Sequence, residues 1–250
     1  MFKFLLKPNW LAAHILVITL ALSLSSLGLW QLNRLKQTKI YNQKVLTKMT
    51  LAPKSLAELD KEYDFRSNLT DLYYLTVRLK GHFDPKNEIL LRGRSYSGQA
   101  GYSILTPFIT NNYTIMVERG WVPIKYNNPP IKEAMPPEGE IEILGKIYPS
   151  QQIPSGWLAN FAPKDPTGKL KIMAYANMQK ISEQTGYDLL DFYIKLDQQI
   201  PKQTKDLPLA LIPEKLDNDN HLSYALQWFS FVLIGLVGYA LIIRKRALER

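Results

Sequence analysis

Residues 10–30 read WLAAHILVITLALSLSSLGLW, and residues 224–243 read YALQWFSFVLIGLVGYALII. The first stretch has 21 residues with His14 as its only ionisable group, and the second has 20 residues with no acid or base other than tyrosine. A helix rises about 1.5 Å per residue, so about 20 residues cross the hydrocarbon core of a bilayer. The sequence therefore predicts two membrane-spanning helices, one toward each end of the chain.

The first apolar stretch could also be a cleaved signal peptide. Lys3 and Lys7 form a basic start, and Ala21-Leu-Ser23 has the small residues of a cleavage site. However, the apolar run continues to Trp30 and is longer than the usual signal core of about 7–15 residues. We therefore interpret this stretch as a retained anchor.

Charges beside the two stretches predict the orientation of the chain. Arg244, Lys245 and Arg246 follow the second stretch, and Asp217 and Asp219 precede it. Because cytoplasmic flanks collect Lys and Arg, the C-terminus should be cytoplasmic, and a chain that crosses twice also has its N-terminus there. One observation disagrees with this orientation, because the basic residues Arg34, Lys36 and Lys39 follow the first stretch on the supposed outer side. However, long loops translocate largely regardless of charge.

These boundaries divide the chain into five parts. They are a cytoplasmic N-terminus at 1–9, a transmembrane helix at 10–30, a periplasmic domain at 31–223, a transmembrane helix at 224–243 and a cytoplasmic C-terminus at 244–250. The periplasmic domain has 25 basic and 21 acidic residues and no basic run with interleaved aromatics, which argues against nucleic acid as a partner. The chain has no cysteine, so it offers no thiolate ligand for copper, zinc or an iron–sulfur cluster.

The pattern of the middle segment predicts a sheet of short strands. Apolar and polar residues alternate with the period of two typical of strands at 74–83, 87–92, 102–110, 113–119, 140–148 and 192–197. Helices are expected at 31–48, just after Ser55 and at 172–186, and the proline-rich stretch 126–171 should be irregular outside its strand. Asn111-Asn112 indicates a tight hairpin, and such short connections leave no room for crossover helices. We therefore expect a membrane α+β fold, in which two transmembrane helices flank one antiparallel β-rich domain that could curl into a barrel.

The middle segment has few residues that are typical of catalytic sites. His82, Asp84 and Glu88 could form part of a metal site, but a solvent-facing His82 at a strand end is the simpler interpretation. The chain has no Gly-x-Ser-x-Gly elbow, Walker loop or dinucleotide-binding glycine pattern. These absences argue against an enzyme.

The outer mouth of the second span is richer in candidate residues. His221 is followed on the same helix face by Tyr224 one turn later and by Trp228 two turns later. Imidazole is a common axial ligand of haem iron, and these aromatics could line a macrocycle whose tail stays in the bilayer. At the same level of the first span lie Trp30 and Arg34, and Arg34 could pair with a carboxylate of a bound amphiphile. The alternative is an ordinary interfacial belt, with a helix-start histidine and a snorkelling arginine.

His14 raises a separate question. It lies roughly 6 Å inside the cytoplasmic edge of the first span, and ionisable residues within spans are functional candidates. However, His14 and His221 lie toward opposite leaflets, so the two should not bind one iron together in a monomer.

Three segments carry a family resemblance. They are LGLWQLNRLKQ at 27–37, GYSILTPFITNNYTIMVERGWVP at 101–123 and NHLSYALQWF at 220–229. In this order, with a domain of this length between two spans, the chain resembles the surfeit locus protein 1 family of assembly factors for haem–copper cytochrome c oxidase. The resemblance implies a non-catalytic factor that receives haem a and delivers it to oxidase subunit I, with haem a synthase as a second partner. It also implies that His221 contacts the haem iron.

The resemblance leaves two matters open. Arg119-Gly-Trp121 is either a strand end, where Gly120 relaxes the backbone and Trp121 packs, or a surface for a partner. A membrane-tethered scaffold that binds only proteins and a membrane-anchored hydrolase remain alternative functions. Only about nine residues precede the first span, too few for a mitochondrial transit peptide, so we expect the bacterial inner membrane.

Overall fold

The computed structural model describes residues 3–63, 69–212, 216 and 220–249. Asp217 and Asp219, which contribute to the expected orientation, lie outside the described residues. The chain divides into two compact units, Met1–Val45 with Lys215–Arg250 and Leu46–Glu214.

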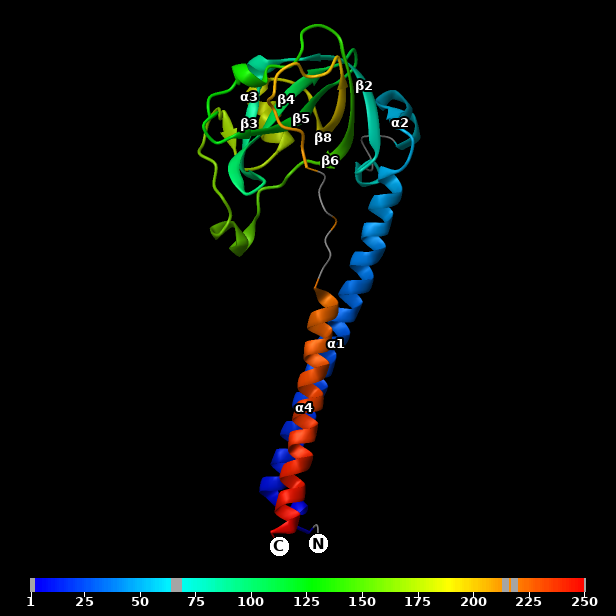
Figure 1. Ribbon diagram of the computed structural model, residues 1–250, viewed down its shortest axis with the longest axis vertical. Helices are drawn as coiled ribbons and strands as arrows, with labels where there is room; N and C mark the ends of the chain where they lie inside the picture. Colours follow the sequence, from blue (N-terminus) through cyan, green and yellow to red (C-terminus); the bar gives the residue numbers. More distant parts are fainter. Residues whose placement is uncertain (1–2, 64–68, 213–215, 217–219, 250) are drawn as a thin grey trace. The chain divides into compact units, whose positions relative to one another are not determined.

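The first unit is built from two long helices. Helix α1 spans Pro8–Met49 and helix α4 spans His221–Leu248, and the short 3₁₀ helix η1 (Lys3–Leu6) precedes α1. Each long helix contains a stretch apolar enough to cross a membrane, and only 6% of that stretch in α1 and 0% in α4 is buried in the protein. The core helix of a soluble protein would bury such a stretch, so the two helices indicate membrane anchoring. The start of α1 and the end of α4 lie at the same end of the helix pair, so the two helices run antiparallel (Figure 1).

The second unit is a mixed β-sheet with short helices. Among the described residues the strands are β1 (Lys54–Ser55), β2 (Thr76–Phe83), β3 (Ile89–Tyr96), β4 (Gln99–Ile109), β5 (Thr114–Pro123), β6 (Ile141–Pro149), β7 (Ile172–Met173) and β8 (Leu189–Ile200). The helices are α2 (Leu56–Tyr63) and α3 (Met178–Thr185), with 3₁₀ turns η2 (Leu69–Asp71), η3 (Pro85–Asn87), η4 (Lys132–Ala134) and η5 (Gly156–Asn160). The strand order is β1-β2-β6-β8-β5-β4-β3-β7.

The sheet is not purely antiparallel, so that prediction is wrong. The early hairpins β3–β4 and β4–β5 are antiparallel as expected, but β1–β2, β3–β7 and β5–β8 are parallel pairs. The long excursion between β5 and β8 lets the chain re-enter the sheet from the same end, which a short connection cannot do. The sheet also curls until β4 meets β2 at two residue pairs, His82↔Ile109 and Phe83↔Phe108. A closed barrel stays a prediction.

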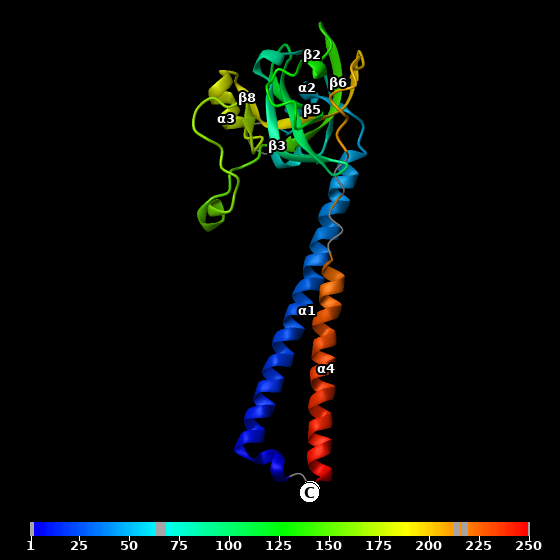
Figure 2. The same cartoon turned by 60° about the vertical axis from the view of Figure 1, so that its left-hand side comes forward.

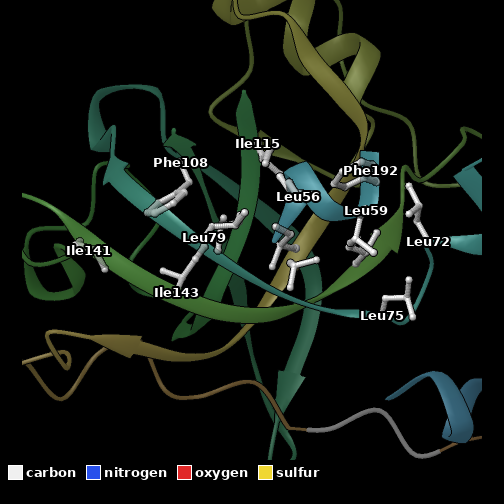
Figure 3. Close-up of a cluster of buried hydrophobic side chains, with 14 of the residues drawn as sticks. Leu56, Leu59, Leu72, Leu75, Leu79, Phe108, Ile115, Ile141, Ile143 and Phe192 are labelled. Carbon is white, nitrogen blue, oxygen red and sulfur yellow. The ribbon is translucent and has the colours of Figure 1, made fainter. Parts of the chain in front are cut away.

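Helix α2 covers one part of the sheet and completes its core. Ser55 and Glu58 cap the helix reciprocally, because the Ser55 backbone N–H donates to Glu58 Oε2 at 2.7 Å and the Glu58 N–H donates to Ser55 Oγ at 3.2 Å. Leu56 and Leu59 point from this helix into a cluster with Phe192 and other side chains of the sheet (Figure 3). Each fully buried leucine contributes about 1.5–3 kcal/mol by leaving water.

Two other elements differ from the predicted ones. The expected helix at 172–186 begins only at Met178, because residues 172–173 pair with β3 and the Asn177 side chain accepts the Lys180 N–H as an N-cap. The helix ends as predicted at Gly186, which adopts φ 75°. Strand β5 continues past its expected end at residue 119 to Pro123.

Candidate functional site

Helices α1 and α4 pack along a regular seam. On α1 the half-buried and buried residues include a series that recurs every three or four positions: Trp10, His14, Val17, Ala21, Leu24, Gly28 and Gln31. A period of 3.5 residues is that of a left-handed helix pair. At Gly28 the helices approach so closely that a Cβ atom would lie 2.7 Å from the Phe229 ring, as expected for small residues at a membrane-helix crossing.

The seam places His221 against Gln31. His221 is the first residue of α4, it is half-buried, and its Nδ1 lies 2.6 Å from Gln31 Oε1. When the Gln31 amide oxygen accepts this hydrogen bond, the proton sits on Nδ1 and the Nε2 atom carries the lone pair. Metal-binding histidines are oriented in the same way by an acceptor for their other ring N–H. The sequence pattern indicates His221 as a site residue but does not indicate its partner Gln31.

The other predicted site residues lie outside the close contact of Gly28 with Phe229. Successive residues turn by about 100° around a helix axis, so Trp30 and Arg34 are rotated by about 160° and 120° from Gly28. In the same way Tyr224 and Trp228 are rotated by about 140° and 100° from Phe229. Trp30 and Tyr224 are 54% and 49% exposed, and the Arg34 side chain is exposed too. Trp228 is half-buried and meets the Phe231 ring edge-on at 6.1 Å. Of the four residues predicted beside His221, three are therefore exposed and Trp228 is half-buried.

His14 belongs to a different part of the seam. Its Nδ1 lies 2.6 Å from Tyr239 Oη, and the two rings meet edge-on at 5.6 Å. Seventeen residues separate His14 from Gln31, which is about 25 Å along a helix. The structure thus separates His14 from His221, as the sequence predicts.

Comparison with known proteins gives the family. The SURF1 family model matches residues 18–233. The chain belongs to the SURF1 family. It is 31% identical over 226 residues to a SURF1-like protein of Rickettsia conorii, covering 89% of this chain and 87% of the relative. An uncharacterised SURF1-like protein of Mycobacterium tuberculosis is 28% identical over 241 residues, 94% of this chain and 83% of the relative. Surfeit locus protein 1 of Takifugu rubripes is 30% identical over 138 residues, 48% of this chain and 55% of the relative.

In this SURF1 family member the block 101–123 forms the hairpin of β4 and β5, and it buries a charged pair. Arg119 Nη2 donates to Glu88 Oε2 at 2.8 Å, and the two side chains are 1% and 0% exposed. Arg119 Nε donates to Thr106 Oγ1 at 2.9 Å, and the Ile131 N–H donates to the second Glu88 oxygen at 2.9 Å. Burial lowers the pKa of Arg119, although the Glu88 charge opposes that shift. Arg119 is thus a structural residue of the core.

The rest of this block also differs from a simple strand end. Gly120 lies inside β5 with φ 154°, and a Cβ atom there would lie 2.4 Å from Leu209 O. The Trp121 N–H donates to that carbonyl at 2.8 Å, and the Trp121 ring stacks on Tyr96 at 5.4 Å. Gly120 is therefore needed for the close approach of the segment at Leu209, and Trp121 packs as predicted.

Beside Trp121 the second unit contains a cavity of about 340 Å³. Buried Glu118 lines it, and no hydrogen bond or ion pair of its carboxylate is present among the described residues. Trp121 Nε1 is also buried without a partner in the described part of the chain. This polar cavity is not predicted from the sequence, because the expected strand ends before Gly120.

The metal site considered at His82 does not form. His82 is exposed, Glu88 is engaged by Arg119, and Asp84 instead caps η3 by accepting the Lys86 N–H at 3.1 Å. Within the described ranges no group of three or more His, Cys, Asp or Glu side chains could hold a metal ion. The solvent-facing interpretation of His82 is therefore correct.

Proposed function

We propose that this protein is an assembly factor for haem–copper cytochrome c oxidase that receives haem a and passes it to subunit I. The observation that carries this proposal is the contact of His221 with Gln31, 2.6 Å between Nδ1 and Oε1, at the mouth of an exposed aromatic face. An imidazole held by an acceptor at Nδ1 is arranged to give its Nε2 lone pair to iron. Membership of the SURF1 family supports the same function.

The residues around His221 suit the chemistry of this cargo. Trp30, Tyr224 and Trp228 offer ring faces on the side of the seam that is open to lipid, where a macrocycle and its apolar tail can lie. The Arg34 side chain is exposed, and its guanidinium can bind a propionate carboxylate. These residues bind and orient the cargo, and no bond-making step is assigned to them.

The proposed location is the bacterial inner membrane with the second unit in the periplasm. Arg244, Lys245 and Arg246, at the end of α4, support cytoplasmic termini because they would hold that end inside. Reporter fusions after Lys125 test this. An active periplasmic reporter is expected, and activity only as a cytoplasmic reporter would overturn the topology.

The proposed partners are oxidase subunit I and haem a synthase. The alternative functions are a scaffold that binds only proteins and a membrane-anchored hydrolase. A spectrum of the full chain, purified after expression alongside haem a synthesis, distinguishes the three. A Soret band with the red-shifted bands of haem a supports the proposed function. Turnover of an ester or glycan substrate would support the hydrolase, and a colourless protein that still captures subunit I would support the scaffold.

A further inference from the structure

The loop between β6 and β7 exposes an unusual group of large apolar side chains. Ile153, Trp157 and Phe161 are 51%, 73% and 78% exposed, and the rings of Trp157 and Phe161 meet edge-on at 5.9 Å. Figures 1 and 2 show the 3₁₀ helix η5, which carries Trp157, at the far end of this loop, away from the sheet. Such an apolar group in water indicates an interaction surface.

Hydrogen bonds fix both ends of the loop to the rest of the second unit, so the position of the exposed tip is defined by the fold. At one end the Gln151 N–H donates to Ala176 O at 2.8 Å, and Gln151 Oε1 accepts the Ala176 N–H at 3.0 Å. At the other end the Asp165 carboxylate accepts Arg92 Nη2 at 3.0 Å and the Ala174 N–H at 2.9 Å. The side chain of Asp165 is only 4% exposed.

We propose that the tip of this loop, residues 153–161, inserts into the interfacial region of the lipid bilayer as a third membrane contact. The chain is anchored by α1 and α4, so the bilayer is present at high effective concentration for any apolar surface on the second unit. Tryptophan prefers the bilayer interface, where an apolar ring body and a polar N–H are both accommodated.

Charge favours lipid over a protein partner as the occupant. Residues 151–164 contain no Asp or Glu, and the first acidic residue, Asp165, is turned inward to Arg92. The exposed Lys164 and Lys169 follow the tip and complement anionic headgroups. An apolar tip with flanking lysines matches the surface of peripheral membrane segments. The proposal depends on membrane anchoring and is independent of haem binding.

Depth-dependent quenching of one fluorophore tests this contact. Because the chain has no cysteine, Asn160→Cys gives a single labelling position at the tip that leaves Trp157 and Phe161 in place. The full chain, carrying a nitrobenzoxadiazole label, is reconstituted in phosphatidylcholine vesicles that contain phosphatidylglycerol. The control label is at Asn112→Cys, in the exposed turn between β4 and β5.

We expect the label at position 160 to emit at shorter wavelength, to be quenched by nitroxide lipids and to be protected from iodide, whereas the label at position 112 behaves in the opposite way. When Trp157→Ser and Phe161→Ser are added, the label at position 160 should no longer be quenched by nitroxide lipids. The control change Ile124→Ser, at another exposed apolar residue, should leave that quenching unaltered. Iodide quenching without lipid quenching would overturn the proposal. Protection from both quenchers would also overturn it and would indicate a protein contact.

Discussion

Replacing Glu88 with glutamine should strongly destabilise the second unit. Glu88 accepts hydrogen bonds from Arg119, Thr106 and the Ile131 N–H, and both it and Arg119 are almost fully buried. Removing one partner of a buried ion pair leaves an uncompensated charge, which costs about 3–5 kcal/mol. This loss is a large share of the roughly 5–15 kcal/mol that stabilises a typical domain.

Urea unfolding of the full chain in detergent, followed by tryptophan fluorescence, measures this loss. The control is Glu142→Gln, because Glu142 pairs with Arg78 at 2.9 Å on the surface, where such a pair contributes about 0–1 kcal/mol. The double variant Glu88→Gln with Arg119→Met should recover much of the stability, since no charge is then left buried. If Glu88→Gln unfolds at the same urea concentration as Glu142→Gln, the buried pair does not hold the hairpin.

Three further changes test other parts of the structure. Gln31→Leu should weaken haem binding by about 10–100-fold, because the acceptor that orients His221 is lost, and a haem titration with unchanged affinity would refute that role. Gly120→Ala should lower the free energy of unfolding by about 1–3 kcal/mol and speed amide exchange at Leu209, because the added Cβ collides with the Leu209 backbone. Unaltered exchange at Leu209 would contradict the close approach. Burial opposes ionisation of Asp84, but hydrogen bonds from Asn87, Tyr187 and the Lys86 N–H outweigh it and hold the pKa below the ordinary 3.8. The stabilisation is therefore present above that pH and lost as pH falls through the lowered pKa, so Asp84→Asn should flatten this acid loss in a pH series of unfolding curves.

The features that local sequence patterns control were predicted well. The apolar stretches lie in α1 and α4, because membrane helices are determined by a continuous run of apolar residues. The hairpin at Asn111-Asn112 joins β4 and β5 as expected. The stop at Gly186 was also correct, because a left-handed C-cap favours glycine.

Features that depend on long-range contacts were not predicted. Nothing local to residues 189–200 shows that β8 will lie parallel to β5, because the pairing depends on the path of the intervening chain. The partnership of Glu88 with Arg119 was missed because the two lie 31 positions apart. A usable signal was present, since two adjacent charged residues, Glu118 and Arg119, interrupt the apolar run of β5 and cannot both face water on one strand.

The candidate site was predicted in part for the same reason. Helical spacing alone grouped His221 with Tyr224 and Trp228, because residues three, four and seven apart share a face. The contact between His221 and Gln31 could not be predicted in this way, because the two residues lie 190 positions apart. Their contact depends on how the two helices pack against each other. Residues 10–30 are almost uniformly apolar, so the sequence of α1 carries no periodic signal that places Gln31 on the facing side.

The haem content per protein tests the central claim most directly. It is measured after expression alongside haem a synthesis, at equal membrane insertion, for the unaltered chain and for His221→Ala, Arg34→Ala and His14→Ala. His221→Ala should lose the haem, because the proposed axial ligand is gone. Arg34→Ala should lose less, since one charge-assisted hydrogen bond contributes about 1.5–3 kcal/mol. His14→Ala should retain it, because His14 lies about 25 Å away along the seam. Full haem in His221→Ala with loss in His14→Ala would contradict the account and place the haem at the other end of the helix pair.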